Sequence, residues 1–293
     1  MPFEATVELL IHIFISLAML CIGMSSSLKD MGRFILERER LLRVLAANVF
    51  IPPIIAVLII AVFPIPRASG VVLFLLAFAP GGINAVQFST KAPGQNTAAG
   101  ALLFLLSLIG LILVPAAAQV LLPVDVLERF AWDQLALRVF GVVGVPLVAG
   151  VLMRVYLPDV AEQIYKPVML ISTASFIASV MMSLSIRQEA ASELGFATIL
   201  AMLVFIVSLL AVGWFLGGDD PDFSQVLAIC TNLRNVGLVY LLVEECCFNP
   251  LYSVSILAFM ALMVPVNLVF TILCAVMRKR REKLQHQSKR ATE

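Results

Sequence analysis

Long apolar runs separated by short polar connections make up most of this chain. Nine of these runs reach the roughly 17 to 25 residues that a helix needs to cross a bilayer. They cover residues 6–26, 41–63, 71–91, 96–121, 135–157, 166–187, 195–217, 223–243 and 251–277. The pattern predicts an all-α integral membrane protein with about nine transmembrane helices, which form one transmembrane domain within residues 1–277.

The third run is interrupted near its middle by residues that hydrocarbon does not tolerate. Pro80 removes a backbone donor, and Gly81 and Gly82 remove side chains, so we expect the helix to break there. Asn84 and Gln87 then add side-chain dipoles next to the freed backbone groups. A proline kink packed against a neighbouring helix is the alternative interpretation.

The eighth run carries a matching interruption formed by Thr231, Asn232, Arg234 and Asn235. By helix rise, Arg234 lies near the bilayer midplane, about eleven residues from either end of its run. The middles of the runs offer no Asp or Glu to pair with it. Its guanidinium can grip a carboxylate, or it can act as a structural cation that donates to carbonyls of the broken helices. One interrupted run in each half of a chain is the sequence pattern of a carrier's substrate site.

Composition and charge support a membrane protein and indicate its orientation. The chain is 61% hydrophobic and 13% charged, with a mean hydropathy of +1.02, whereas soluble domains carry about 25% charged residues. A net charge of +1 gives no reason to expect a nucleic-acid partner. Lysine and arginine gather in alternate connections, which the positive-inside rule assigns to the cytoplasm. They are Lys29, Arg33, Arg38, Arg40 and Arg43, then Arg154 and Lys166, and the residues from Arg278 onward.

This charge pattern predicts an outside N-terminus and a cytoplasmic C-terminus in a multi-pass protein of the cell membrane, plasma or inner. Residues 278–293 form a basic cytoplasmic tail that we expect to be disordered. The loop at 217–220 is an exception, because it would be cytoplasmic without carrying a cation. The two interrupted runs cross the membrane in opposite directions, as an inverted repeat of residues 6–121 and 135–277 requires. We expect the two broken helices to cross each other near the bilayer centre.

Other polar residues in the runs carry less chemistry. His12 lies in the first run without a partner visible in the sequence, and we interpret it as a hydrogen-bonded polar residue rather than a proton relay. Asn48 and Asn267 are expected to form interhelical hydrogen bonds. The five cysteines lack metal-ligand spacing, so we expect free thiols.

Three short segments resemble motifs of the bile acid/sodium symporter family and of related organic-anion carriers. CIGMSSSLKDMGRF (21–34) resembles that family's second-helix motif, APGG (79–82) the break in its fourth helix, and LRNVGL (233–238) the MQNxGL of its ninth. The resemblance covers nearly the whole chain and leaves out the family's first helix, which accounts for nine spans instead of ten. It implies a core of runs two, three, four, seven, eight and nine. A panel of runs one, five and six would move against this core, and the broken helices would cross at the substrate site.

The sodium-site motifs of that family are not kept. Cys230 stands where the family has a glutamate, Arg234 where it has a glutamine, and Ala85 and Val86 where it has a Ser-Asn pair. Sodium is a hard cation that prefers oxygen ligands, which a thiol does not supply, and an arginine would repel it. We therefore expect no metal and no cofactor. The residues that remain as candidate sodium ligands are Asn84, Thr231 and Asn232.

These observations predict a secondary transporter of a small organic anion that works by alternating access and is not coupled to sodium. The candidate substrate-binding residues are Asn84, Gln87, Thr231, Asn232, Arg234 and Asn235. A sodium-coupled symporter with rearranged ligands stays open as an alternative, and so does a membrane sensor that kept the fold and lost transport. No catalytic motif is recognisable, so an enzyme is not expected. The expected partners are the organic anion and the lipid bilayer, with a homodimer left open.

Overall fold

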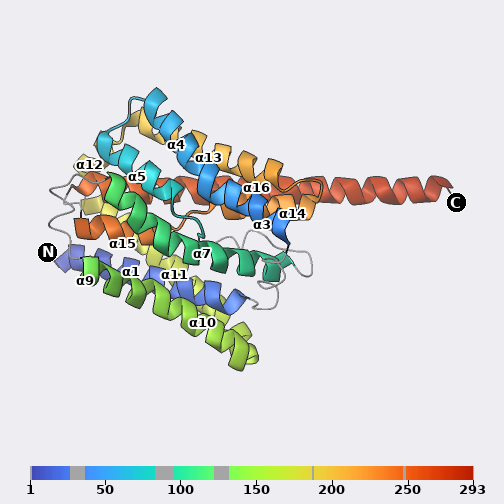
Figure 1. Ribbon diagram of the computed structural model, residues 1–293, viewed down its shortest axis with the longest axis horizontal. Coiled ribbons are helices and arrows are strands. Elements are labelled where there is room, and N and C mark those ends of the chain that lie inside the picture. The colour runs from blue at the N-terminus through green and yellow to red at the C-terminus, as the bar shows by residue number, and fades with distance from the viewer. Residues whose placement is uncertain are drawn as a thin grey trace.

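The computed structural model describes residues 2–26, 37–82, 95–121, 132–186, 188–246 and 249–292, and every regular element in these ranges is helical (Figure 1). In chain order the elements are α1 (Pro2–Ser25), α3 (Arg38–Leu45), the π-helix η1 (Ala46–Phe50), α4 (Ile51–Val62), α5 (Arg67–Ala77), α7 (Gln95–Leu121), α9 (Trp132–Val139), the π-helix η2 (Phe140–Gly144), α10 (Val145–Tyr156), α11 (Pro158–Ile186), α12 (Gln188–Glu193), α13 (Gly195–Leu216), α14 (Pro221–Asn232), α15 (Val236–Cys246) and α16 (Pro250–Thr292).

Seven helical stretches within the described ranges are long and apolar enough to cross a membrane. They are Ala5–Ser25, Arg38–Val62, Leu102–Val120, Ala136–Tyr156, Pro158–Ser183, Gly195–Leu216 and Pro250–Arg280, and each overlaps one predicted run. The two runs left over are the interrupted ones. The run at 71–91 overlaps the short helix α5, and the run at 223–243 is divided between α14 and α15. The all-helical, multi-pass architecture is confirmed, while nine spans and an inverted repeat stay predictions.

Two sequence-based expectations about polar helix ends are wrong. The helix expected over 166–187 already begins at Pro158, because α11 continues through charged residues that a count of apolar residues leaves out. The tail expected to be disordered instead extends α16 as a helix to Thr292, beyond the bundle in Figure 1. Residues 278–292 are rich in the good helix formers Lys, Arg, Glu and Gln, and they contain no Gly or Pro that would end the helix.

The helices pack as two groups. In the first, α1 lies against α10 and α11 over much of its length. Gly23 and Gly150 permit the close approach of α1 and α10, because a Cβ on either glycine would meet backbone atoms of the other helix. The second group contains α4, α5, α13, α14, α15 and α16, and α7 touches both groups. The closest pair in the second group is α13 and α14, where Gly213 lies against the backbone of Ala228.

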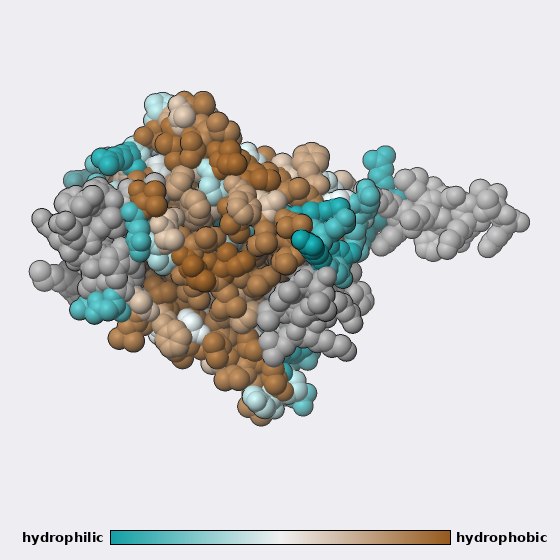
Figure 2. Space-filling model, viewed as in Figure 1, coloured by the Kyte–Doolittle hydropathy of each residue, from teal (hydrophilic) through white to brown (hydrophobic). Residues whose placement is uncertain are grey.

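Apolar side chains face outward around the middle of the molecule. In Figure 2, hydrophobic residues cover the centre of the view, and hydrophilic residues gather toward its two ends. On α4 and the end of η1, Phe50, Ile54, Leu58 and Val62 are each more than half exposed. Their spacing of four residues places them on one helix face. An apolar stripe of this kind suits contact with lipid and not with water.

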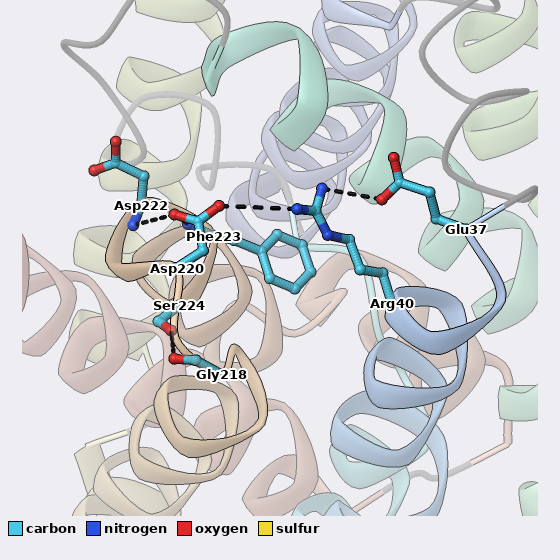
Figure 3. Close-up of polar contacts among 7 residues, drawn as sticks. All are labelled: Glu37, Arg40, Gly218, Asp220, Asp222, Phe223 and Ser224. Carbon is cyan, nitrogen blue, oxygen red and sulfur yellow. Dashed lines mark hydrogen bonds and ion pairs between the residues drawn. The ribbon is translucent and has the colours of Figure 1, made fainter.

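At one polar end of the molecule, α3 and α16 contact the α13–α14 loop and the start of α14. Figure 3 shows the contacts of α3 and of this loop. Asp220 caps α14, since its Oδ1 accepts from the amides of Asp222 at 3.0 Å and Phe223 at 3.3 Å. On α3, a guanidinium nitrogen of Arg40 lies 3.9 Å from an Asp220 carboxylate oxygen, and the same guanidinium stacks over the Phe223 ring. On α16, Arg278 pairs with Asp222 at 2.6 Å. This acidic segment, whose loop carries no cation of its own, thus receives two arginines from other elements.

Candidate functional site

The eighth apolar run is broken at the predicted place. The three residues between α14 and α15, Leu233, Arg234 and Asn235, are not helical. Asn235 caps the second half-helix, because its Oδ1 accepts from the amide of Leu238 at 3.1 Å. Asparagine is among the preferred residues for this capping role. The backbone therefore leaves one helix and enters the next within a few residues.

The third run also leaves its helix where the breaker residues predicted, and the two breaks meet. Pro80 lies opposite Arg234 in an isolated antiparallel bridge. Two backbone hydrogen bonds of 2.7 Å hold this bridge, one from the Gly82 amide to the Leu233 carbonyl and one from the Asn235 amide to the Ala79 carbonyl. Backbone groups that lipid could not satisfy are thus paired between the two breaks.

Two glycines make this close approach possible. Gly81 has a φ of 91°, which is a conformation that residues with a side chain rarely adopt. A Cβ on Gly81 would lie 2.6 Å from the amide nitrogen of Ser107 on α7. A Cβ on Gly82 would lie 2.5 Å from the carbonyl oxygen of Arg234. The predicted break residues therefore also provide the space that the crossing needs.

The guanidinium of Arg234 lies at this crossing, and the residue is only 1% exposed. Its Nη1 donates to two backbone carbonyls, that of Asn48 in η1 at 3.1 Å and that of Ala77 at the end of α5 at 3.4 Å. The Ala77 carbonyl ends the helix of the interrupted third run, whereas the Asn48 carbonyl lies inside the continuous helical stretch Arg38–Val62. These bonds are of the kind expected for a structural cation that donates to backbone carbonyls.

Three prolines explain why these two carbonyls are available. The Asn48 carbonyl would accept from residue 52 in an α-helix and from residue 53 in a π-helix, but Pro52 and Pro53 have no N–H to donate. The Ala77 carbonyl belongs to the last residue of α5, and Pro80 cannot supply the amide of a tighter 3₁₀ turn. The sequence removes the ordinary donors, and the guanidinium replaces them with a charged one.

One edge of the guanidinium takes no part in these bonds. Nε and Nη2 of Arg234 are buried and have no hydrogen-bond partner among the described residues. Their N–H groups lie side by side on a planar fork, which matches the two oxygens of a carboxylate. Arg234 can therefore hold the two interrupted helices with one nitrogen and bind an anion with its other edge.

Buried amide side chains beside the crossing also have unused hydrogen-bonding capacity. Both polar atoms of Asn232, Nδ2 of Asn235 and Oδ1 of Asn48 have no partner within the ranges that the structure describes. All three residues are fully buried. Because buried polar groups in native proteins nearly always have partners, this set indicates a place for a polar ligand or ordered water.

The structure brings four of the six predicted substrate-binding residues together at the crossing: Thr231, Asn232, Arg234 and Asn235. Thr231 accepts a hydrogen bond at its Oγ1 from Nδ2 of Asn48 at 3.3 Å, which confirms the interhelical bond predicted for Asn48. Asn84 and Gln87, together with Ala85 and Val86, lie outside the described residues.

One asparagine differs from what the sequence predicted, and another has a further role. Asn267 does not bond between helices through its amide nitrogen, because Nδ2 donates instead to the Met263 carbonyl of its own helix at 2.8 Å. Asn48 forms its predicted interhelical bond and is also part of the crossing site, because its backbone carbonyl accepts from Arg234. Its position four and five residues before two prolines is the signal that could have identified its free carbonyl.

Two backbone oxygen atoms at this crossing already accept hydrogen bonds from the guanidinium. The Asn48 and Ala77 carbonyls accept from Arg234, and Cys230 provides a buried thiol instead of a carboxylate. A sodium ion among these groups would also meet the charge of the guanidinium at close range.

An apolar cavity of about 290 Å³ lies between α1, α11 and α16. Phe14, Phe176, Met181 and Met260 are its largest lining side chains, and Thr173 adds a hydroxyl. Aromatic and methionine side chains line sites for apolar ligand groups, because they offer large and adaptable contact surfaces. The cavity connects the first helix group with α16 of the second.

One comparison with known proteins identifies the family of the chain. A sequence model of the Sodium Bile acid symporter family matches residues 12–194, which run from α1 into the α12–α13 connection and end before the second break. No curated protein matches the chain. The family match covers more than half of the 293 residues and includes the break at Pro80 that meets Arg234. The chain therefore belongs to the sodium bile acid symporter family, whose members are membrane transporters.

Proposed function

We propose that the protein is a secondary transporter of a small organic anion, in which Arg234 takes the place of a coupling sodium ion. The observation that carries this proposal is that the nitrogen atoms of one guanidinium differ in their hydrogen bonding. Nη1 donates to the carbonyls of Asn48 and Ala77, while Nε and Nη2 have no partner in the described part of the chain.

The cationic half of the proposal rests on the two carbonyls. The Ala77 carbonyl belongs to the last residue of α5, and the negative end of a helix dipole favours a positive charge. The Asn48 carbonyl lies inside the helical stretch Arg38–Val62, where Pro52 and Pro53 leave it without a backbone donor. In a sodium-coupled carrier a mobile cation supplies that charge. Here the charge is covalently attached, so the crossing keeps its positive charge at every stage of the transport cycle. A sodium ion is therefore not needed to supply it.

The anionic half rests on the free edge of Arg234 and on the apolar cavity. A guanidinium at membrane depth is costly by itself, and a bound carboxylate would offset that cost through two parallel hydrogen bonds. The cavity beside Phe14 and Phe176 suits an apolar substrate body. We infer an organic monoanion with a compact charged group and an apolar remainder.

Transport would proceed by movement of the α1, α10 and α11 group, as a panel, against a core that carries the crossing. The separation of the two helix groups in their packing supports this assignment. Arg234 is almost fully buried, so an anion reaches it only when the panel and the core separate on one side. In this proposal the N-terminus lies outside and the basic end of α16 in the cytoplasm of a cell or inner membrane.

The test is counterflow of labelled organic anions into liposomes that contain the purified protein, in sodium or potassium buffer. We expect uptake at equal rates in the two buffers, and loss of uptake in Arg234→Gln but not in Arg280→Gln, which removes an exposed arginine from α16. Uptake that saturates with Na⁺ and fails with K⁺ would establish sodium coupling instead. Specific binding of an anion without counterflow would establish a sensor.

A further inference from the structure

We propose that Glu8, His12 and Glu244 form a binding site for a divalent transition-metal ion, best matched by zinc, where α1 meets α15. One ligand atom from each side chain lies within 4.8 Å of the other two. Glu8 and His12 are one helical turn apart on α1 and therefore share a face. Glu244 comes from the last turns of α15, at the same end of the molecule as the start of α1 (Figure 1).

The ligand chemistry fits zinc better than the hard divalent ions. Zinc accepts imidazole nitrogen and carboxylate oxygen, and sites with three protein ligands keep a fourth position for water or another ligand. Magnesium and calcium prefer oxygen ligands alone. Ligand atoms around one tetrahedral zinc lie roughly 3.4 Å apart, given bonds of about 2.0–2.2 Å. The three side chains are each half-buried, so modest rotamer changes would bring them to that spacing.

A neighbouring hydroxyl orients one of the ligands. Tyr240 lies one turn before Glu244 on α15, and its Oη donates to Glu244 Oε1 at 3.3 Å. Tyr240 is 3% exposed, so its ring is fixed by packing. Hydrogen bonds from an outer residue to a ligating carboxylate are a regular part of metal sites, because they fix the direction of the ligand.

The position of this cluster gives the metal a structural consequence. α1 belongs to the first helix group and α15 to the second. The two helices are also in contact further along α1, where a Cβ on Gly237 of α15 would meet the side chain of Ile15. A metal bound by Glu8 and His12 on one side and Glu244 on the other would tie the two groups together at one end of the molecule.

This arrangement changes the interpretation of His12. Glu8 lies one helical turn before it in the sequence, whereas Glu244 lies more than 230 positions away along the chain. The fold places two carboxylates beside its imidazole. Zinc binding at this point stands on geometry alone, while an effect of zinc on transport rests on the proposed function as well.

Zinc binding can be measured directly on purified, tag-free, full-length protein in detergent after treatment with a chelator. Titration calorimetry with ZnCl₂ should show one saturable site, and zinc should raise the thermal unfolding temperature, since a ligand of the folded state stabilises it. MgCl₂ should do neither. His12→Ala and Glu244→Gln should each weaken zinc binding at least about tenfold, and Tyr240→Phe should weaken it by about tenfold through loss of the outer hydrogen bond.

His286→Ala provides the matched control, because it removes the other of the two histidines in the chain. It should leave zinc affinity unchanged. If His12→Ala fails to elute as a folded species, Glu8→Gln serves in its place, since it removes one ligand and keeps the side-chain volume. Absence of saturable zinc binding in the wild type would overturn the proposal. So would binding that depends on His286 and not on His12, or binding equal in wild type and Glu244→Gln.

The effect on the transport cycle is tested separately by counterflow with and without saturating ZnCl₂. Zinc should slow exchange in the wild type by about the fraction of protein that is zinc-bound, and it should have no effect on Glu244→Gln. Zinc binding without inhibition would retain the site and reject its role as a tie between the two groups. Absence of counterflow altogether would count against the proposed function and not against the metal site.

Discussion

The backbone carbonyl of Asn48 lies four residues before Pro52, and it accepts its hydrogen bond from Arg234, a residue 186 positions further along the chain. The residue that removes the local donor and the residue that replaces it therefore belong to different helices. The same guanidinium also reaches the end of α5 through the Ala77 carbonyl. One side chain thus connects η1, α5 and the α14–α15 break, so changes at any of the three should affect the others.

Replacing the guanidinium with a neutral amide tests its structural role. Arg234→Gln should lower the stability of the ligand-free protein by about 2–3 kcal/mol, because hydrogen bonds from a charged donor contribute roughly 1.5–3 kcal/mol and their loss leaves buried carbonyls unpaired. The measurement is thermal unfolding in detergent, with Arg280→Gln as the control for loss of an exposed arginine. An unchanged unfolding temperature would show that Arg234 does not hold the crossing.

Arg234→Lys separates charge from geometry. The ammonium keeps the positive charge and can donate to the Asn48 and Ala77 carbonyls, so stability should change less than in Arg234→Gln. It lacks the planar edge formed by Nε and Nη2, and anion affinity should therefore fall at least about tenfold. Binding is measured by thermal shift or scintillation proximity with the transported anion. Wild-type affinity in the lysine variant would reject a bidentate anion contact.

Gly82 tests the approach of the two breaks. Gly82→Ala places a Cβ 2.5 Å from the Arg234 carbonyl oxygen and 2.6 Å from the Leu233 carbonyl carbon. Both neighbours are backbone atoms, which cannot rotate away, so we expect a loss of at least about 2 kcal/mol from overpacking and from the broken bridge. Gly141→Ala is the control, because nothing lies within 4 Å of its added Cβ. Equal unfolding temperatures of the two variants would contradict the tight crossing.

Features that depend on local chemistry could be predicted from the sequence. Proline, two glycines and an arginine inside apolar runs cannot remain in lipid-facing helices, so the breaks at Pro80 and Arg234 followed from composition and position. Their crossing was predicted as well, because one interrupted run in each half of a chain is the pattern of a carrier's substrate site. The family motifs APGG and LRNVGL lie at the same two places.

Features that depend on distant contacts could not be predicted. The free carbonyl of Asn48 is visible in the sequence, but its partner is not, because any buried donor could reach it. The same holds for one neighbour of His12, because Glu8 lies one turn earlier on the same helix but Glu244 comes beside it only after α1 and α15 are packed. The helical end of α16 differs from the prediction for another reason: its high charge predicts disorder, whereas Lys, Arg and Glu are also good helix formers.

The cap of α14 provides a prediction at the polar end shown in Figure 3. Asp220→Ala should cost about 1 kcal/mol, because the amides of Asp222 and Phe223 lose the side-chain oxygen that accepts from them. Asp220→Asn keeps an acceptor and should cost less, apart from the weak pairing with Arg40, which exposure limits to about 0–1 kcal/mol. Asp219→Ala, in the adjacent position, is the control. Thermal unfolding of the three variants distinguishes a capping contribution from a general effect of charge.

A double substitution tests whether Arg234 stands in for sodium. Cys230→Glu supplies the carboxylate that the resembling motif has at this position, and Arg234→Gln removes the resident charge and supplies an amide oxygen. Together they leave the Asn48 and Ala77 carbonyls free to ligate a cation with oxygen donors. We expect the double variant to be less stable than wild type in potassium buffer and to regain stability as Na⁺ is added, through binding to the folded state alone.

Neither single variant should respond, because Cys230→Glu keeps the arginine as its partner and Arg234→Gln lacks the carboxylate. Unfolding temperatures of all four proteins, measured across a sodium titration at constant ionic strength, provide the test. A sodium response already present in wild type would show that the guanidinium leaves a cation site open, and no response in the double variant would show that the crossing never provided one.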